Sequence, residues 1–103
     1  MLTSVDTDLI KALSDPLRMR IVSLLARETL CTTHLTEETG ARQTNLSNHL
    51  RLLRDAGVVE TEPCGRFTYY RLRPEALDSL SEALTDLAAT ARSTGAAHNK
   101  RAC

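Results

Sequence analysis

The 103-residue sequence predicts a mainly α-helical domain that carries one small β-hairpin. Apolar residues recur at three- and four-residue spacing through most of the chain, which is the period of an amphipathic helix. Residues that start helices precede these segments, and glycines follow two of them. Between residues 59 and 72 the pattern changes to alternation, with β-branched and aromatic residues that favour strands.

The first two helices are predicted on either side of Asp15. Residues 7–13 form a short helix with apolar side chains on one side. A second helix starts at Asp15 and Pro16, because aspartate caps the unpaired N–H groups of a helix and proline fits its first position. Its apolar residues follow at i, i+4, i+7 and i+8, namely Leu17, Ile21, Leu24 and Leu25.

A helix-turn-helix is predicted between residues 32 and 57, after a segment at 29–31 that is short but compatible with a strand. Thr32 or Thr33 is expected to cap the first helix, and Gly40 to end it in the left-handed conformation. A tight turn at 40–42 leads into the second helix, which Gly57 closes. The second helix buries a stripe of leucines, Leu46, Leu50 and Leu53.

A hairpin is predicted after the helix-turn-helix, from alternating Val59, Thr61, Phe67 and Tyr69. The sequence Glu-Pro-Cys-Gly at 62–65 suits a type I turn with proline at its second position and a glycine bulge after it. This turn would place Cys64 at the exposed tip of the hairpin.

The last helix is predicted from Pro74 to about Arg92. Its apolar residues repeat at alternating three- and four-residue spacing, which forms a short heptad seam. The seam would pack either on its own domain or, as we favour, on a second copy of the chain. We expect residues 1–92 to form one domain and 93–103 a flexible tail. The seam consists of Leu77, Leu80, Leu84, Leu87 and Ala91.

The charge balance is neutral overall but strongly local. Thirteen basic and thirteen acidic residues cancel, yet residues 41–54 carry three arginines and no acid. The N-terminus lacks the features of a signal peptide, and no apolar run is long enough for a membrane span. Three cysteines without framework spacing are typical of a reduced protein. These features predict a cytoplasmic protein that is not bound to a membrane.

The face of the fourth predicted helix points to nucleic acid. It has no carboxylate before Asp55, whereas an ordinary solvated face mixes Lys with Glu. Amide side chains pair with adenine and arginine pairs with guanine in the major groove of a duplex, while hydroxyl groups hold phosphates. The arrangement therefore predicts binding to double-stranded DNA. The residues of this face are Gln43, Thr44, Asn45, Ser47, Asn48 and Arg51.

Three stretches together resemble one family. "KALSDPLRMRIVSLL", "TNLSNHLRLLRDAGVVE" and "GRFTYYRL" are similar, in that order, to the ArsR/SmtB family of bacterial metal-responsive winged-helix repressors, over residues 7–92. The resemblance implies a winged helix-turn-helix homodimer, built from the first and last helices, that releases a palindromic operator when an effector binds. The recognition positions it implies are Gln43, Thr44, Asn45, Ser47, Asn48 and His49, with Arg66 in the wing. From the residues alone, His49 could equally be a packed or phosphate-contacting histidine.

This sequence lacks most of the ligand residues of the effector sites known in this family. The site on the last helix uses histidines, and residues 72–92 contain none. The site on the recognition helix uses cysteines, and residues 42–56 contain none. Of the cysteine cluster at the start of the third helix only Cys31 remains, with Thr33 and Thr36 at the positions that its partners would occupy.

A thiolate site would therefore use Cys31, Cys64 and Cys103. Such donors suit trivalent arsenic or antimony, and also a soft ion such as cadmium, lead or zinc. If segment 29–31 pairs near Arg71, Cys64 lies roughly 17–20 Å from Cys31. We favour a site of Cys31 from one subunit and Cys103 from the other, with Cys64 as third donor or spectator and with His34 and His98 as auxiliary candidates.

Three other interpretations stay open. The cysteines could sense oxidation through a disulfide, or Cys31 could be an ordinary core residue. An enzyme is disfavoured because the chain lacks recognisable catalytic motifs, and no catalytic cofactor is expected. A protein-interaction module would differ from a DNA-binding protein in its weak dependence on salt.

Overall fold

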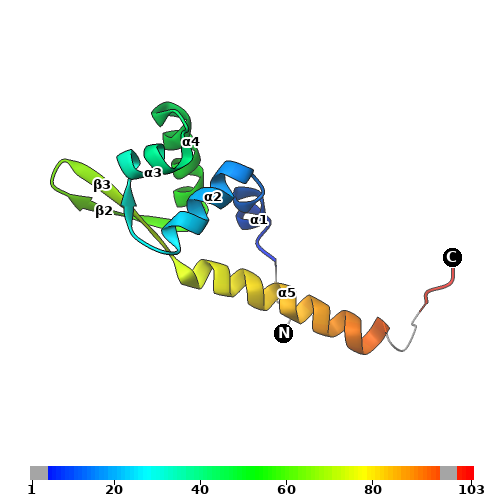
Figure 1. Ribbon diagram of the computed structural model, residues 1–103. Helices are drawn as coiled ribbons and strands as arrows, with labels where there is room; N and C mark the ends of the chain where they lie inside the picture. The colour runs from blue at the N-terminus through cyan, green and yellow to red at the C-terminus, as the bar shows by residue number, and fades with distance from the viewer. Residues whose placement is uncertain (1–4, 96–99) are drawn as a thin grey trace.

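The computed structural model describes residues 5–95 and 100–103. Helices α1 to α4 gather in one body, a hairpin projects from it, and one long helix leaves it (Figure 1). The expected mainly α-helical winged helix-turn-helix is confirmed. The elements are α1 (Thr7–Leu13), α2 (Pro16–Leu25), β1 (Leu30–Cys31), α3 (Thr32–Thr39), α4 (Gln43–Asp55), β2 (Val59–Cys64), β3 (Phe67–Leu72) and α5 (Pro74–Gly95).

The helix ends follow the predicted caps. The Asp15 carboxylate accepts a hydrogen bond from the backbone N–H of Arg18 at 3.0 Å, and Pro16 is the first residue of α2. Gly40 ends α3 with a φ of 71°, and Gly57 follows α4 with a φ of 79°, a conformation that favours glycine. The N-cap of α3 is Cys31, whereas Thr32 or Thr33 was expected.

The hairpin and β1 form an antiparallel sheet in the order β1-β3-β2. The predicted turn at 62–65 is wrong by two positions, because Cys64 still pairs with Phe67 and the chain reverses at Gly65 and Arg66. Two-residue loops fit the twist of a hairpin when glycine supplies a positive φ, and Gly65 has a φ of 62°. Pro63 therefore lies within β2, opposite Thr68.

The core lies between the four N-terminal helices and the inner face of the sheet. Leu46, Leu50 and Leu53 are at most 1% exposed, which confirms the predicted stripe of α4. This stripe packs with buried side chains from every other element of the body. They include Leu9, Ala12, Ile21, Val22, Leu25, Leu30, Leu35, Val58 and Val59.

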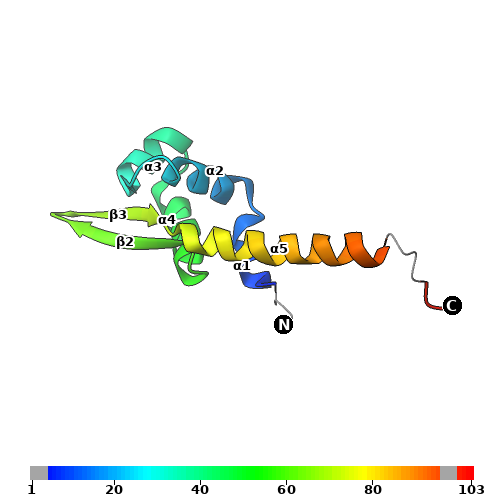
Figure 2. The same cartoon turned by 90° about the horizontal axis from the view of Figure 1, so that it is seen from below.

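Helix α5 extends far beyond this core (Figures 1 and 2). Its 22 residues measure about 33 Å at 1.5 Å per residue. The Cα radius of gyration is 17.7 Å, against about 13 Å for a compact chain of 100 residues. Leu77 and Leu80 at its start pack against the core, whereas Leu84 and Leu87 are 48% and 54% exposed. Much of the predicted seam is therefore uncovered in a single chain.

Helix α5 continues to Gly95, three residues beyond the predicted helix end near Arg92. Residues 96–99 of the expected tail, including His98, lie outside the described residues. Residues 100–103 are exposed and have no regular structure. None of the described helices is long and apolar enough to cross a bilayer.

Candidate nucleic-acid interface

The polar face of α4 lies open to solvent, on the side opposite its leucine stripe. The amide, hydroxyl and guanidinium side chains predicted to face outward are all exposed. A helix with one apolar stripe fixes its rotation by burying that stripe, so the polar residues have no other face to occupy. The exposed members are Gln43, Thr44, Asn45, Ser47, Asn48 and Arg51.

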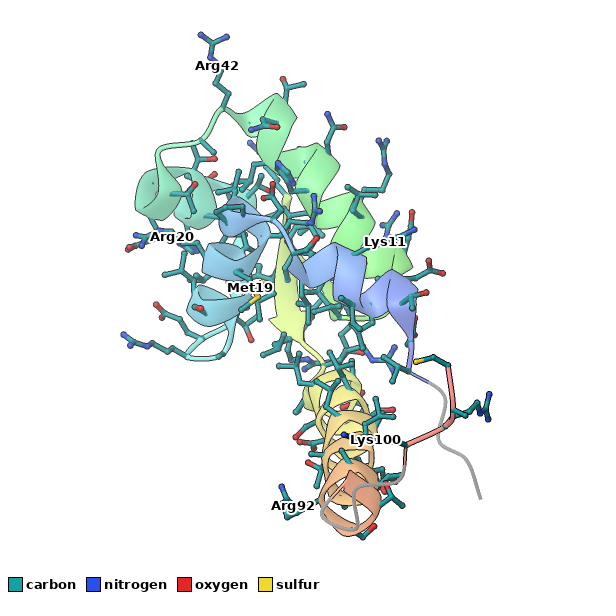
Figure 3. The ribbon with its side chains drawn as sticks, turned by 90° about the vertical axis from the view of Figure 1, so that its right-hand side faces the viewer. Lys11, Met19, Arg20, Arg42, Arg92 and Lys100 are labelled. Carbon is teal, nitrogen blue, oxygen red and sulfur yellow. The ribbon has the colours of Figure 1, made fainter. Side chains whose placement is uncertain are left out.

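Positive charge accompanies this face. Arg42 is the N-cap residue of α4, makes no side-chain capping bond and projects outward from the turn (Figure 3). Arg51 donates to Asn48 Oδ1 at 3.3 Å, and Arg54 is exposed one turn further on. The carboxylate of α4 is that of Asp55, its last residue. The local field therefore favours an anionic partner although the chain is neutral.

His49 differs from its neighbours because it is turned toward α2. Its side chain is 17% exposed, and its Nδ1 lies 2.9 Å from Arg18 Nη1 and 3.9 Å from the Asp15 carboxylate. A guanidinium group can only donate, so the imidazole nitrogen accepts this bond. His49 thus contacts α2 and is not part of the exposed polar face of α4.

The Arg18 guanidinium connects three helices. Its Nε donates to the Ala12 carbonyl at 2.7 Å, its Nη2 to the Lys11 carbonyl at 3.2 Å, and its Nη1 to His49. The first two carbonyls lie at the end of α1. The hydrogen bond from the Arg18 N–H lowers the pKa of Asp15, and the charge of the Arg18 guanidinium acts in the same direction. One side chain therefore ties the end of α1 to α4.

The wing presents one unpaired arginine at its tip. Arg66 is exposed in the turn, and no ion pair of Arg66 occurs within residues 5–95 and 100–103. Arg71 is different, since its guanidinium donates to the Glu60 carboxylate at 2.8 Å and lies 3.8 Å from Glu62. The bond with Glu60 raises the pKa of Arg71. Arg66 is therefore the wing residue available to an anion.

The cysteines lie in three different environments, and none forms a disulfide. Cys31 is buried, and its Sγ lies 3.4 Å from His34 Nδ1, which also accepts the Cys31 N–H at 3.2 Å. The His34 ring meets the Tyr69 ring edge-on at 5.9 Å. Cys64 and Cys103 are both exposed.

The predicted separation of Cys31 and Cys64 is too long. Cys31 lies opposite Tyr69 and Cys64 opposite Phe67, so both cysteines share one face of the sheet. Two residues along a strand and two strand spacings put their Cα atoms about 12 Å apart. The prediction of 17–20 Å assumed pairing near Arg71, two residues further from the tip.

Even 12 Å is too long for one ion, because metal–sulfur bonds measure about 2.3 Å. Within the part of the chain that the structure describes, no three His, Cys, Asp or Glu side chains converge as metal ligands. Cys31 and Cys64 of a single chain therefore do not form a ready site.

The sequence and the fold of this chain are similar to those of known proteins of one family. Residues 15–61, from the N-cap of α2 into β2, match the model of bacterial regulatory proteins of the arsR family. An arsenical resistance operon repressor of Staphylococcus xylosus is 37% identical over 76 residues, which cover 74% of this chain and 73% of that protein. The chain belongs to the arsR family.

Further members of the arsR family support the assignment. The arsenic resistance transcriptional regulator ArsR1 of Pseudomonas putida is 42% identical over 66 residues, 63% of this chain. The match covers 52% of that protein, so the chain spans about half the length of this relative. An ArsR-like transcriptional regulator from Rhodococcus sp. RHA1 has a TM-score of 0.82 and 26% identity, over 88% of this chain and 86% of that one.

Two side chains beside the polar face of α4 are not among the predicted contacts of this arsR-family chain. Arg42 immediately precedes α4, and its charge, counted with the other arginines of residues 41–54, is the signal that marks it. Arg18 was not recognisable, because it lies 31 positions from His49 in the sequence. Only the fold brings these two side chains together.

Proposed function

We propose that this arsR-family chain is a transcriptional repressor that binds double-stranded operator DNA. The observation that carries the proposal is the exposed polar face of α4, placed after α3 and the tight turn at Gly40. In helix-turn-helix proteins the second helix enters the major groove. There Gln43 and Asn48 would pair with adenine and Arg51 with guanine.

The remaining exposed residues have supporting roles in this proposal. The hydroxyl groups of Thr44 and Ser47 and the guanidinium of Arg42 would hold phosphates and set the register. Arg66 at the wing tip would reach the backbone or the adjacent minor groove. We assign His49 to holding α4 in place, because its Nδ1 is occupied by Arg18.

The uncovered part of α5 supports a homodimer. A groove along this helix is lined by Leu77, Leu80, Ser81, Leu84, Thr85 and Ala88. Ile10 of α1 is also 38% exposed. Short chains bury a small fraction of their surface, so a second copy on this apolar face would stabilise both subunits. We infer that α1 and α5 pair with their copies and set the spacing of the two recognition helices.

We propose trivalent arsenic or antimony as the effector. The names of the relatives from P. putida and S. xylosus refer to arsenic, and three reduced cysteines are available. Cys31 and Cys64 of one chain are too far apart to share an ion. The favoured donors are therefore Cys31 of one subunit and Cys103 of the other. Eight residues beyond Gly95 span at most about 28 Å. That length suffices if antiparallel α5 helices bring each tail to the base of the other wing.

Release of DNA would follow from linkage. An effector changes DNA affinity only if it binds one dimer geometry better than another. A tail held at the base of the partner's wing would change the spacing of the two α4 helices. The recognition surfaces would then no longer match half-sites about 34 Å apart.

The DNA-binding proposal is tested by fluorescence anisotropy with a duplex from upstream of the coding sequence. Affinity should fall at least tenfold between about 50 and 200 mM salt, because each phosphate contact displaces counterions. Asn48→Ala and Arg51→Ala should weaken binding, whereas Arg27→Ala on an exposed turn is the matched control. Salt-independent binding, or none by the wild-type protein, would reject DNA binding as the function.

The effector proposal is tested by titrating arsenite against the protein–DNA complex. Wild type and Cys64→Ser should release DNA, whereas Cys31→Ser and Cys103→Ser should not. Cadmium and hydrogen peroxide serve as parallel probes of soft-metal and disulfide sensing. Release by either of these probes without release by arsenite would overturn the arsenic assignment and leave the DNA-binding proposal intact.

A further inference from the structure

A small groove separates α4 from β3 at the base of the wing. Its cavity measures about 160 Å³ and is lined by Ser47, Leu50, Arg51, Arg54 and Tyr70. Four of these five side chains carry hydrogen-bond donors, two of them are cationic, and the lining includes no carboxylate. This composition is suited to an anion.

Three of the four donors of the groove lie on one side of α4. Ser47, Arg51 and Arg54 are spaced i, i+4 and i+7, so they share one side of the helix. Arg51 uses one N–H on Asn48 Oδ1 at 3.3 Å. Within residues 5–95 and 100–103, the Ser47 hydroxyl and the Arg54 guanidinium have no hydrogen-bond partner. Both therefore remain available to a ligand.

Tyr70 closes the groove from the sheet. It is half-buried, packs against the hydrophobic core and lies between Leu30 and Thr61 of the neighbouring strands. These contacts hold its ring, and its hydroxyl has no partner among the described residues. A fixed ring can present its hydroxyl to a ligand at little entropic cost.

The location of the groove identifies the anion, provided that the proposed DNA binding holds. With α4 in the major groove and the wing tip in the adjacent minor groove, one sugar-phosphate strand separates the two. That strand must cross the junction of α4 and β3. Its phosphates carry the anionic oxygens that guanidinium and hydroxyl groups bind best.

We propose that this groove binds a single backbone phosphate of the strand that divides the two grooves. Arg54 and Tyr70 are the new members of the interface, beside Ser47 and Arg51. Arg54 supplies charge, and Tyr70 supplies a fixed neutral donor. The contact carries no base information, so it contributes equally on every sequence and sets how deeply α4 sits.

The test measures DNA affinity as a function of salt for Arg54→Gln and Tyr70→Phe. Loss of one charged phosphate contact reduces the slope of log affinity against log salt by about 0.9. Arg54→Gln should show this reduction, with a roughly tenfold weaker affinity at low salt. Tyr70→Phe keeps the packed ring and loses a neutral donor, so its affinity should fall severalfold with an unchanged slope.

Both losses should be equal on the upstream duplex and on a scrambled duplex of the same length. Arg27→Gln, which removes an exposed arginine outside the interface, should change neither quantity. An unchanged slope in Arg54→Gln, or a loss confined to the upstream duplex, would overturn the groove assignment. Failure of the wild-type protein to bind either duplex would instead reject the proposed function.

A neutral methylphosphonate placed singly along the duplex locates the contact. At one position per half-site, this substitution should weaken DNA binding by the wild-type protein. At the same position it should leave the already weaker binding by Arg54→Gln unchanged. Additive losses at every position would mean that Arg54 contacts no phosphate. A normal thermal unfolding curve for both variants confirms that the comparison is between folded proteins.

Discussion

Truncation of the exposed leucines of α5 should separate the proposed dimer. Leu84 and Leu87 are 48% and 54% exposed in one chain, and both belong to the heptad seam. The double variant Leu84→Ala, Leu87→Ala removes these side chains without introducing charge. Each subunit should keep its fold, because neither leucine belongs to the core of the winged domain.

The magnitude follows from the surface that a partner would cover. Burying a whole leucine side chain contributes about 1.5–3 kcal/mol, and roughly half of each is still exposed. A symmetric dimer buries four such halves, so the double variant should lose roughly 3–6 kcal/mol of association free energy. At 1.4 kcal/mol per factor of ten, the dissociation constant rises roughly 10²- to 10⁴-fold.

Sedimentation equilibrium over a dilution series measures this change directly. Glu82→Ala, on the opposite side of the same helix, is the matched control and should leave the dissociation constant unchanged. A double variant that dimerises as tightly as the wild-type protein would refute the reasoning. So would a wild-type protein that stays monomeric throughout the micromolar range.

Three further predictions concern the folded domain. Leu50→Ala should cost about 2–5 kcal/mol of unfolding free energy, measured by urea denaturation, because its side chain is 1% exposed. A double-mutant cycle on DNA affinity tests the contact between Arg18 and His49. Arg18→Lys and His49→Leu should each weaken DNA binding, and the double variant should bind no more weakly than either single variant. Additive losses would show that the two side chains act independently. Folding lowers the pKa of Asp15 from its ordinary value of 3.8, so its contribution to stability is complete above that pH and is lost as pH falls through the lower folded value. Asp15→Asn keeps a good N-cap and should remove this part of the acid sensitivity, which thermal unfolding at pH 3 and 7 measures.

The helices were predictable because their signals are local. Asp15 with Pro16, Gly40 and Gly57 act on the backbone beside them, and the leucine stripe of α4 needs only the helical period. The polar face of α4 followed from that stripe by elimination. The same reasoning yielded the candidate DNA-contacting residues, apart from the orientation of His49.

The errors arose where distant segments meet. The register of β1 on β3 sets the distance between Cys31 and Cys64, and no local pattern specifies that register. The hairpin turn is a local exception: proline is common in turns, which favours Pro63 there, but Gly65 provides the positive φ that a two-residue loop requires. The contact of Arg18 with His49 and the groove between Arg54 and Tyr70 also depend on tertiary packing.

The proline within β2 affects whether the outer edge of the wing can pair with another molecule. β2 is an outer strand, and an unpaired strand edge can template association with the same edge of another molecule. Pro63 cannot donate a hydrogen bond there. Glu60 and Glu62 share one guanidinium, that of Arg71, so this part of the strand keeps a net negative charge that repels an identical edge. The outer edge of the projecting hairpin therefore disfavours strand pairing with a second molecule, which protects the protein against fibrillar aggregation.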